Sequence, residues 1–126
     1  MPRLIAIALG GVIGSVARFA VAQPFSPWTA FDWPWATLIV NVVGCLLIGI
    51  IASSPAIERG PLWLRPFLIT GVLGGFTTFS AFALETGLLL EGGRVGAAAA
   101  YLGVTLAVGL LAVRLGVRIE RALPWR

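Results

Sequence analysis

The residues most able to do chemistry lie in one apolar stretch, GVLGGFTTFSAFALET, which runs from Gly71 to Thr86. Two adjacent glycines near its start allow a helix to unwind, and unwound backbone exposes carbonyl and amide groups that protein, water or an ion must satisfy. Hydroxyl residues and phenylalanines follow, and Glu85 comes near the end. This combination predicts a membrane helix that is broken near Gly74-Gly75 and whose free carbonyl groups can hold Na⁺.

The phenylalanines after the glycine pair suggest an anion site. Phe79 and Phe82 are three residues apart and share one helical face. That spacing usually indicates core packing, which stays an alternative. An aromatic ring has a positive edge, so ring edges together with neutral Asn, Thr and Ser donors would attract a small anion without a full positive charge. Such a site binds weakly enough to release the ion again.

Further neutral donors occur in two other apolar stretches. Asn41 lies in the middle of ATLIVNVVGCLLIG, where a carboxamide is costly unless it is paired. Thr37 precedes it by four residues and therefore shares its helical face. Tyr101 and Thr105 repeat that spacing. Spacing alone leaves two equal interpretations, which are hydrogen bonding between helices and a polar track for a permeant species.

The sequence lacks the parts of an enzyme. It contains no histidine, and its single cysteine, Cys45, excludes an intrachain disulfide and any zinc site built from several cysteines. The apolar stretches also contain no pair of carboxylates, and no serine has a neighbouring base. We therefore expect no catalytic set and no enzymatic activity.

The elements that position these residues are membrane helices. The chain is 59% hydrophobic and only 11% charged, against about 25% charged residues in an average soluble domain. A helix needs about 20 residues to cross the hydrocarbon layer, and four stretches are long and apolar enough. We expect an all-α membrane protein, residues 1–126 forming a single four-helix unit with spans near 4–22, 36–53, 66–90 and 95–117.

The charged residues support a membrane location rather than nucleic-acid binding. All nine basic residues are arginines scattered among apolar runs, which is typical of interfacial anchors. Arg18 ends the first span, as an anchor or with a structural role. If four spans alternate, seven arginines lie on the side of the termini and two, Arg18 and Arg94, on the other. The seven are Arg3, Arg59, Arg65, Arg114, Arg118, Arg121 and Arg126.

Three motifs together give a resemblance that covers essentially the whole chain. They are GGVIGSVARF, ATLIVNVVGCLLIG and GVLGGFTTFSAFALET, in that order. The sequence resembles the Fluc fluoride channels, also called the CrcB family. The resemblance implies passive efflux of fluoride through two pores at the interface of an antiparallel dimer, in the plasma (inner) membrane of the cell. The dimer is either a homodimer or a pair with an oppositely oriented homologue.

The resemblance also implies roles for individual residues. Asn41, Phe79 and Phe82 match pore-lining positions, with Thr37 and Ser80 in matching segments beside them, and Tyr101 and Thr105 match a polar track on the fourth helix. The backbone carbonyls of Gly74 and Thr77 match the ligands of a structural Na⁺ on the dimer axis, and Glu85 matches an acidic residue near a pore mouth. The sequence departs from relatives at Gly109, where the polar track can continue with a serine.

Two rival functions fit parts of the sequence. A small multidrug exporter is also a four-helix antiparallel dimer, but it needs a carboxylate inside the membrane for proton coupling, and the first two spans have none. A purely structural membrane subunit would explain the packing glycines but not the predicted break in the third span.

Overall fold

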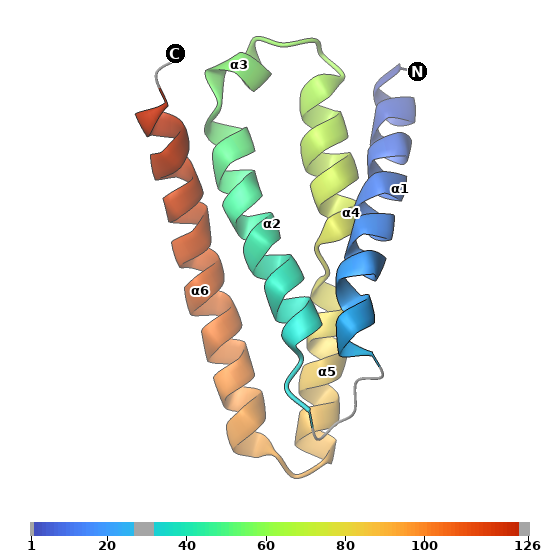
Figure 1. The fold of residues 1–126 in the computed structure, drawn as a ribbon, viewed down its shortest axis with the longest axis vertical. Helices are drawn as coiled ribbons and strands as arrows, with labels where there is room; N and C mark the ends of the chain where they lie inside the picture. Colours follow the sequence, from blue (N-terminus) through green and yellow to red (C-terminus); the bar gives the residue numbers. More distant parts are fainter. Residues whose placement is uncertain (1, 27–31, 124–126) are drawn as a thin grey trace.

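A computed structural model describes residues 2–26 and 32–123, so Met1, Trp125 and Arg126 are among the residues outside it. Within these ranges every regular element is helical (Figure 1). Four segments are long and apolar enough to cross a membrane: Pro2–Phe25, Trp35–Ser53, Pro66–Glu91 and Val95–Ala122. The all-α membrane class predicted from composition is therefore confirmed.

The first, second and fourth spans are continuous helices. The first consists of α1 (Pro2–Ala22) followed by the short 3₁₀ turn η1 (Gln23–Phe25). The second and fourth are α2 (Trp35–Ser53) and α6 (Val95–Ala122). Helix α6 continues five residues beyond the predicted end at Val117, because arginine side chains can reach the interface while their stems stay on apolar surface.

The third span is composite. A π-helical segment, η2 (Pro66–Leu73), leads into one turn of α-helix, α4 (Gly74–Phe76). Helix α5 (Phe79–Glu91) then completes the span. The backbone is extended between them, with ψ of 160° at Thr77 and 121° at Thr78. Figure 1 shows this interruption about halfway along the span.

The interruption lies after the glycine pair and not at it. Gly74 keeps helical dihedral angles, with φ −64° and ψ −34°. At Gly75 a Cβ atom would meet the carbonyl oxygen of Gly11 at 2.6 Å, so this glycine allows α1 to approach. The extended residues Thr77 and Thr78 thus begin two residues after the glycine pair near which the break was expected, and close packing against α1 keeps Gly75 in a helix.

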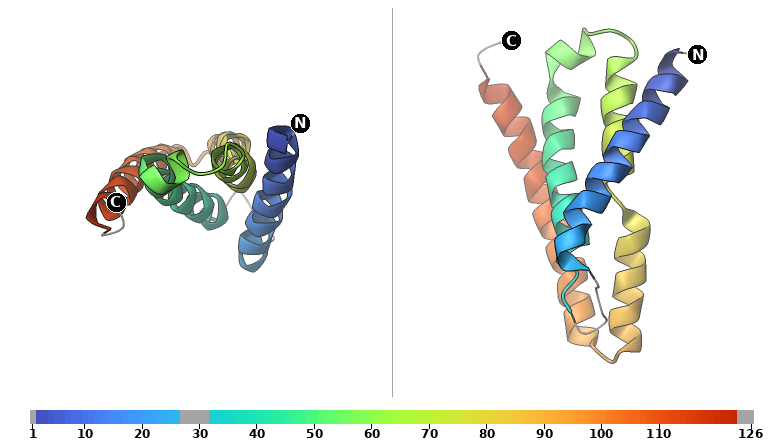
Figure 2. Two further views of the ribbon diagram at one scale, coloured as in Figure 1. Left: turned by 90° about the horizontal axis from the view of Figure 1, so that it is seen from above. Right: turned by 45° about the vertical axis from the view of Figure 1, so that its right-hand side comes forward.

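Glycines set two close helix pairs. Along α1, Gly10 and Gly14 are buried against η2 and α4, where an added Cβ atom would collide with the backbone of Phe67 and Val72. Between α2 and α6, Gly49 and Gly116 play the same part. Small residues bring membrane helices close enough for their backbones to pack. Figure 2 shows α1 crossing the upper half of the third span while α6 runs beside α2.

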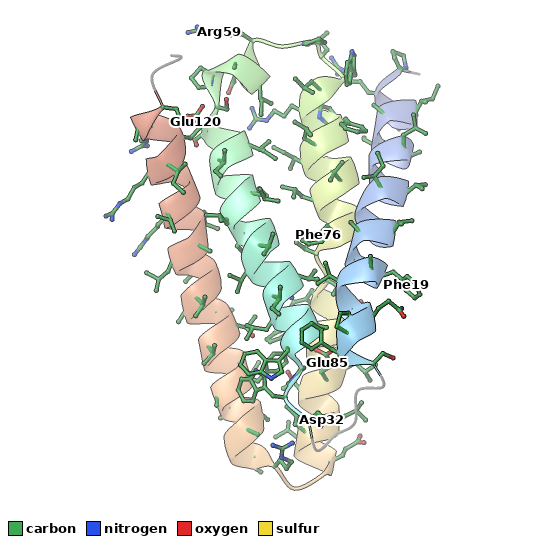
Figure 3. The ribbon with its side chains drawn as sticks, in the orientation of Figure 1. Phe19, Asp32, Arg59, Phe76, Glu85 and Glu120 are labelled. Atoms are coloured by element: carbon green, nitrogen blue, oxygen red, sulfur yellow. The ribbon has the colours of Figure 1, made fainter. Side chains whose placement is uncertain are left out.

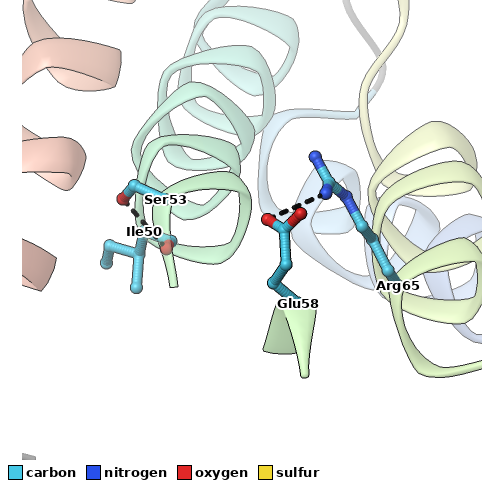
Figure 4. Close-up of polar contacts among 4 residues, drawn as sticks. All are labelled: Ile50, Ser53, Glu58 and Arg65. Atoms are coloured by element: carbon cyan, nitrogen blue, oxygen red, sulfur yellow. Dashed lines mark hydrogen bonds and ion pairs between the residues drawn. The ribbon is translucent and has the colours of Figure 1, made fainter. Parts of the chain in front are cut away.

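The connections place the start of α1 and the end of α6 at the same end of the bundle (Figure 1). A short helix, α3 (Pro55–Glu58), follows α2, and Glu58 forms an ion pair with Arg65 at 3.3 Å (Figure 4). At the opposite end a tight turn joins α5 to α6, and Gly93 has φ +72°, a conformation that favours glycine. Trp33 and Arg94 belong to this second end, where Arg94 Nη1 donates to the Asp32 carbonyl at 3.4 Å.

Candidate functional site

A carboxylate links three of the four spans near one end of the bundle. Glu85 Oε1 accepts a hydrogen bond from Thr37 Oγ1 at 2.7 Å, and its Oε2 accepts one from Tyr101 OH at 2.7 Å. Thr37 and Tyr101 are both buried. Glu85 projects from α5 beside the lower half of α2 (Figure 3). Each oxygen of the carboxylate therefore has a hydroxyl donor within the bundle.

One turn further along α2, Asn41 clamps the interruption of the third span. Asn41 Nδ2 donates to the Thr78 carbonyl at 2.9 Å, and Asn41 Oδ1 accepts from the Thr78 amide at 2.9 Å. The carboxamide therefore satisfies both backbone groups of one extended residue. Because its nitrogen carries two N–H groups, one donor remains for a further partner.

The same interruption removes helical donors from two carbonyl groups. In an unbroken helix the amide of Thr78 would donate to the carbonyl of Gly74, and that of Ala81 to the carbonyl of Thr77. Here Thr78 donates to Asn41 instead, and Ala81 donates to Thr78 Oγ1 at 3.2 Å, which caps the start of α5. The Gly74 and Thr77 carbonyls are thereby available to other ligands.

The two phenylalanines of the predicted site differ in burial. Their ring centroids lie 5.8 Å apart. Phe82 is only 7% exposed and packs against Tyr101, with centroids 5.1 Å apart, whereas Phe79 is 78% exposed. Phe82 thus belongs to the core of the chain, and Phe79 projects from its surface.

A cleft of about 440 Å³ brings most of the predicted residues together. Residues from α2, the composite third span and α6 line it, and among them are Asn41, Gly74, Thr77, Phe79, Phe82 and Thr105. The hydroxyl of Thr105 is buried and has no hydrogen-bond partner among the described residues. The cleft therefore contains neutral donors and aromatic edges and no charged side chain.

A second cleft, of about 300 Å³, shares the lining residue Thr78 with the first. Arg18 and Glu85 both line it, together with Thr37 and Thr78. Ser80 belongs to neither cleft; it is exposed, and its hydroxyl lies 3.2 Å from Thr78 Oγ1. Apart from Ser80 and Tyr101, which line neither cleft, the predicted residues thus fall into two neighbouring groups.

Thr78 is the residue that sequence reasoning left without a role. It receives both bonds from Asn41, caps α5 and lines both clefts. The available signal is a threonine directly before a helix, which is typical of an N-cap. Trp33 was also given no role in the site, yet it packs edge-on against Tyr101 with centroids 5.8 Å apart.

The arrangement can replace the hydration shell of a small anion. Hydroxyl and carboxamide donors lie at successive levels between α2, α5 and α6, and the walls between them are apolar. A cleft without a full positive charge would bind an anion without trapping it.

Nearly the whole chain is similar to proteins that are already known. Residues 5–117 match the family model described as CrcB-like protein, Camphor Resistance (CrcB). A relative from Nitrobacter winogradskyi, named fluoride-specific ion channel FluC, is 45% identical over 95% of this chain and 96% of its own length. Relatives with the same name from Rhodospirillum centenum and Paracoccus denitrificans are 41% and 45% identical. They cover 96% and 93% of this chain, and 97% and 93% of their own lengths.

Proposed function

The chain belongs to the CrcB-like protein family, and from this premise we propose that it lets fluoride leave the cell passively across a membrane. It is a fluoride channel and not an enzyme. The observation that carries this function is the similarity to fluoride-specific channels over nearly the full length of both chains. The cleft of neutral donors supplies a physical route for the ion.

Fluoride is small and strongly hydrated, so a pathway must offer good hydrogen-bond donors in place of water. In this proposal the free N–H of Asn41 and the hydroxyl of Thr105 serve the ion within the cleft, and the edges of Phe79 and Phe82 face it. Chloride is larger and is excluded by the narrow spacing of these groups. The donors remain in place as the ion passes, because Thr78 fixes the carboxamide through two bonds.

The membrane potential provides the driving force. Undissociated HF crosses lipid and dissociates in a less acidic cytoplasm, where the anion is trapped. A negative interior then favours outward movement of the anion by about 2.3 kcal/mol per charge for every 100 mV. No coupled proton is needed. This distinguishes the proposal from a multidrug exporter, since Glu85 already accepts two hydroxyl hydrogen bonds in the bundle.

We propose that two copies pair in antiparallel orientation. Support comes from the surface of the single subunit, where the cleft is bordered by exposed apolar side chains such as Phe79, Leu106 and Leu110. A second subunit over this face would bury them and close the cleft into a pathway. The homodimer is favoured over a pair with a homologue because residues of the pathway and of the proposed cation site all occur in this one chain.

The proposed structural cation is Na⁺, held by the backbone carbonyls of Gly74 and Thr77. These carbonyls are open to the ion because the amides that would bond them in a continuous helix have other partners. The Thr78 amide donates to Asn41, and the Ala81 amide donates to the Thr78 hydroxyl. Oxygen ligands without thiol or imidazole suit a hard cation. When bound, the ion would neutralise the carbonyl dipoles at the interruption. Thr77 also anchors its own hydroxyl to the Leu73 carbonyl at 2.9 Å, which fixes this turn.

The orientation proposal places the chain in the plasma (inner) membrane in both directions. The arginine bias favours termini in the cytoplasm, so dual insertion needs that bias to be too weak to fix the topology. A cysteine added at the C-terminus in a Cys45→Ser background tests this in vesicles. Labelling from both faces together with fluoride efflux supports the homodimer, and labelling from one face with efflux only after a homologue is added contradicts it.

The function itself is tested by reconstitution. Purified chain in liposomes loaded with fluoride should release the ion when a potassium-selective ionophore balances the charge, and a fluoride electrode records the initial rate. A structural subunit would leave release at the level of protein-free liposomes. A multidrug exporter would instead move a cationic dye against its gradient when a proton gradient is applied.

A further inference from the structure

Two rows of residues, one on α2 and one on α6, repeat every four positions, and their second and third members line the larger cleft. On α2 the row is Thr37, Asn41 and Cys45; on α6 it is Tyr101, Thr105 and Gly109. Thr37 and Tyr101, which form the first level, both donate hydrogen bonds to Glu85. The second and third levels line the cleft. Successive levels of one row are about 6 Å apart along a helix.

At the third level the polar side chain lies on α2 and not on α6. Gly109 offers no side chain, so the row on α6 ends with Thr105. Opposite it on α2 stands Cys45, and a Cβ atom built on Gly109 would lie 3.4 Å from the Cys45 sulfur. The thiol therefore occupies the space into which a side chain at position 109 would project.

The surroundings of this level are otherwise apolar. Ile48, Leu73, Leu110 and Val113 line the same part of the cleft. The Thr77 hydroxyl also lines the cleft but donates to the Leu73 carbonyl, which leaves the Cys45 S–H as the side-chain donor available to a ligand beside Gly109. An ion that moves beyond Asn41 and Thr105 toward the end of the bundle where α1 starts thus meets the thiol next.

A second observation concerns the level before this one. Thr105 lines the cleft, and its hydroxyl oxygen is buried and has no hydrogen-bond partner in the part of the chain that the structure describes. A buried hydroxyl without a partner is costly, so a transient partner in the cleft would relieve that cost. The thiol lies one level further along the same wall.

We propose that Cys45 is the third donor of the fluoride pathway and takes over the position that Gly109 leaves empty on α6. This inference rests on the proposed function. The S–H group is a weak donor, which suits a step where the ion must be passed on and not retained. The residue is therefore a specificity-determining group of the pathway, placed on α2 beside the position where α6 has Gly109.

The test moves the donor from one helix to the other. Initial fluoride efflux is measured from liposomes that contain the wild type, Cys45→Ala, Cys45→Ser or the double variant Cys45→Ala/Gly109→Ser. We expect Cys45→Ala to lower the rate by about tenfold, since the pathway loses a donor to a charged ligand. Cys45→Ser should keep the rate. The double variant should recover most of it, because the serine fills the space that the sulfur leaves.

A labelling experiment on the unmodified chain removes the dependence on variants that fold poorly. Methyl methanethiosulfonate should react with Cys45 and stop efflux, and fluoride but not chloride should slow the reaction. The Cys45→Ser variant should be insensitive to the reagent.

Three results overturn the inference. One is a Cys45→Ala variant that conducts like the wild type. Another is a loss of efflux that Gly109→Ser does not restore, combined with labelling that fluoride does not slow, because a packing role would give that pattern. A wild type that does not conduct at all overturns the proposed function as well, so the two failures are distinguishable.

Discussion

Replacing Asn41 with alanine removes both bonds that hold Thr78 in its extended conformation. Each bond measures 2.9 Å between heavy atoms, and together they satisfy the amide and the carbonyl of one residue. Hydrogen bonds between membrane helices contribute about 0.6 kcal/mol on average and up to about 1.7 kcal/mol. The free energy of unfolding should therefore fall by about 1 to 3 kcal/mol.

The effect on transport should exceed the effect on stability. The variant loses the donor that faces the cleft, and a hydrogen bond to a charged partner contributes about 1.5 to 3 kcal/mol. Since about 1.4 kcal/mol on a barrier changes a rate tenfold, fluoride efflux should fall by at least about tenfold. Efflux from liposomes is recorded with a fluoride electrode, and unfolding is followed by loss of helical circular dichroism in increasing sodium dodecyl sulfate.

Ser53→Ala provides the matched control. Its hydroxyl donates to the carbonyl of Gly49 at 2.6 Å within the same helix, outside both clefts. It should retain wild-type efflux. If Asn41→Ala also conducts at the wild-type rate, the carboxamide serves only to hold helices together and the reasoning about the cleft is wrong.

Three further predictions follow from the site and the packing. Phe79→Ile and Phe82→Ile should both lower efflux because each removes a ring edge, and Phe82→Ile should also lower the free energy of unfolding because its ring is only 7% exposed within the single chain; normal efflux in both would assign them to packing alone. Exchanging Na⁺ for N-methylglucamine on both sides of the membrane should lower efflux, and full activity after exhaustive removal of Na⁺ would disprove the cation proposal. Gly14→Leu should prevent stable folding, measured as loss of a monodisperse peak in detergent, because its side chain would collide with Val72; Gly11→Ala is the control, since its Cβ atom meets nothing within 4 Å.

The spans and their order could be predicted from the sequence because hydrocarbon imposes a length on every crossing helix. The run Ala36–Ser53 contains no charge, and each of the other three predicted spans contains a single charged residue, which no soluble packing arrangement explains in so short a chain. The end of the fourth helix could not be predicted this way. Hydropathy falls where arginines begin, but backbone hydrogen bonds continue to Ala122.

The position of the break in the third span is harder to predict from the sequence than its existence. Glycine permits unwinding but also permits close packing, and the sequence does not reveal which use applies at Gly74 and Gly75. The structure has α1 against Gly75, which keeps that turn helical. The extended residues come next, where Asn41 supplies bonds to Thr78 from a helix that is distant in sequence.

The polar residues were identified by type and spacing, but their partners were not. Spacing of four placed Thr37 with Asn41 and Tyr101 with Thr105. It could not show that Glu85 accepts hydrogen bonds from Thr37 and Tyr101, because those contacts depend on how three helices pack. The sequence expectation of Glu85 near a pore mouth stays a prediction, as do the roles of the residues that line the cleft.

The most direct test of the central claim compares two halides in one preparation. Liposomes that contain the purified chain are loaded with equal concentrations of fluoride and chloride, and an ionophore balances the charge while separate electrodes follow each anion. The account predicts rapid release of fluoride, with chloride retained as in protein-free liposomes. Release of both anions at similar rates, or of neither, would contradict it.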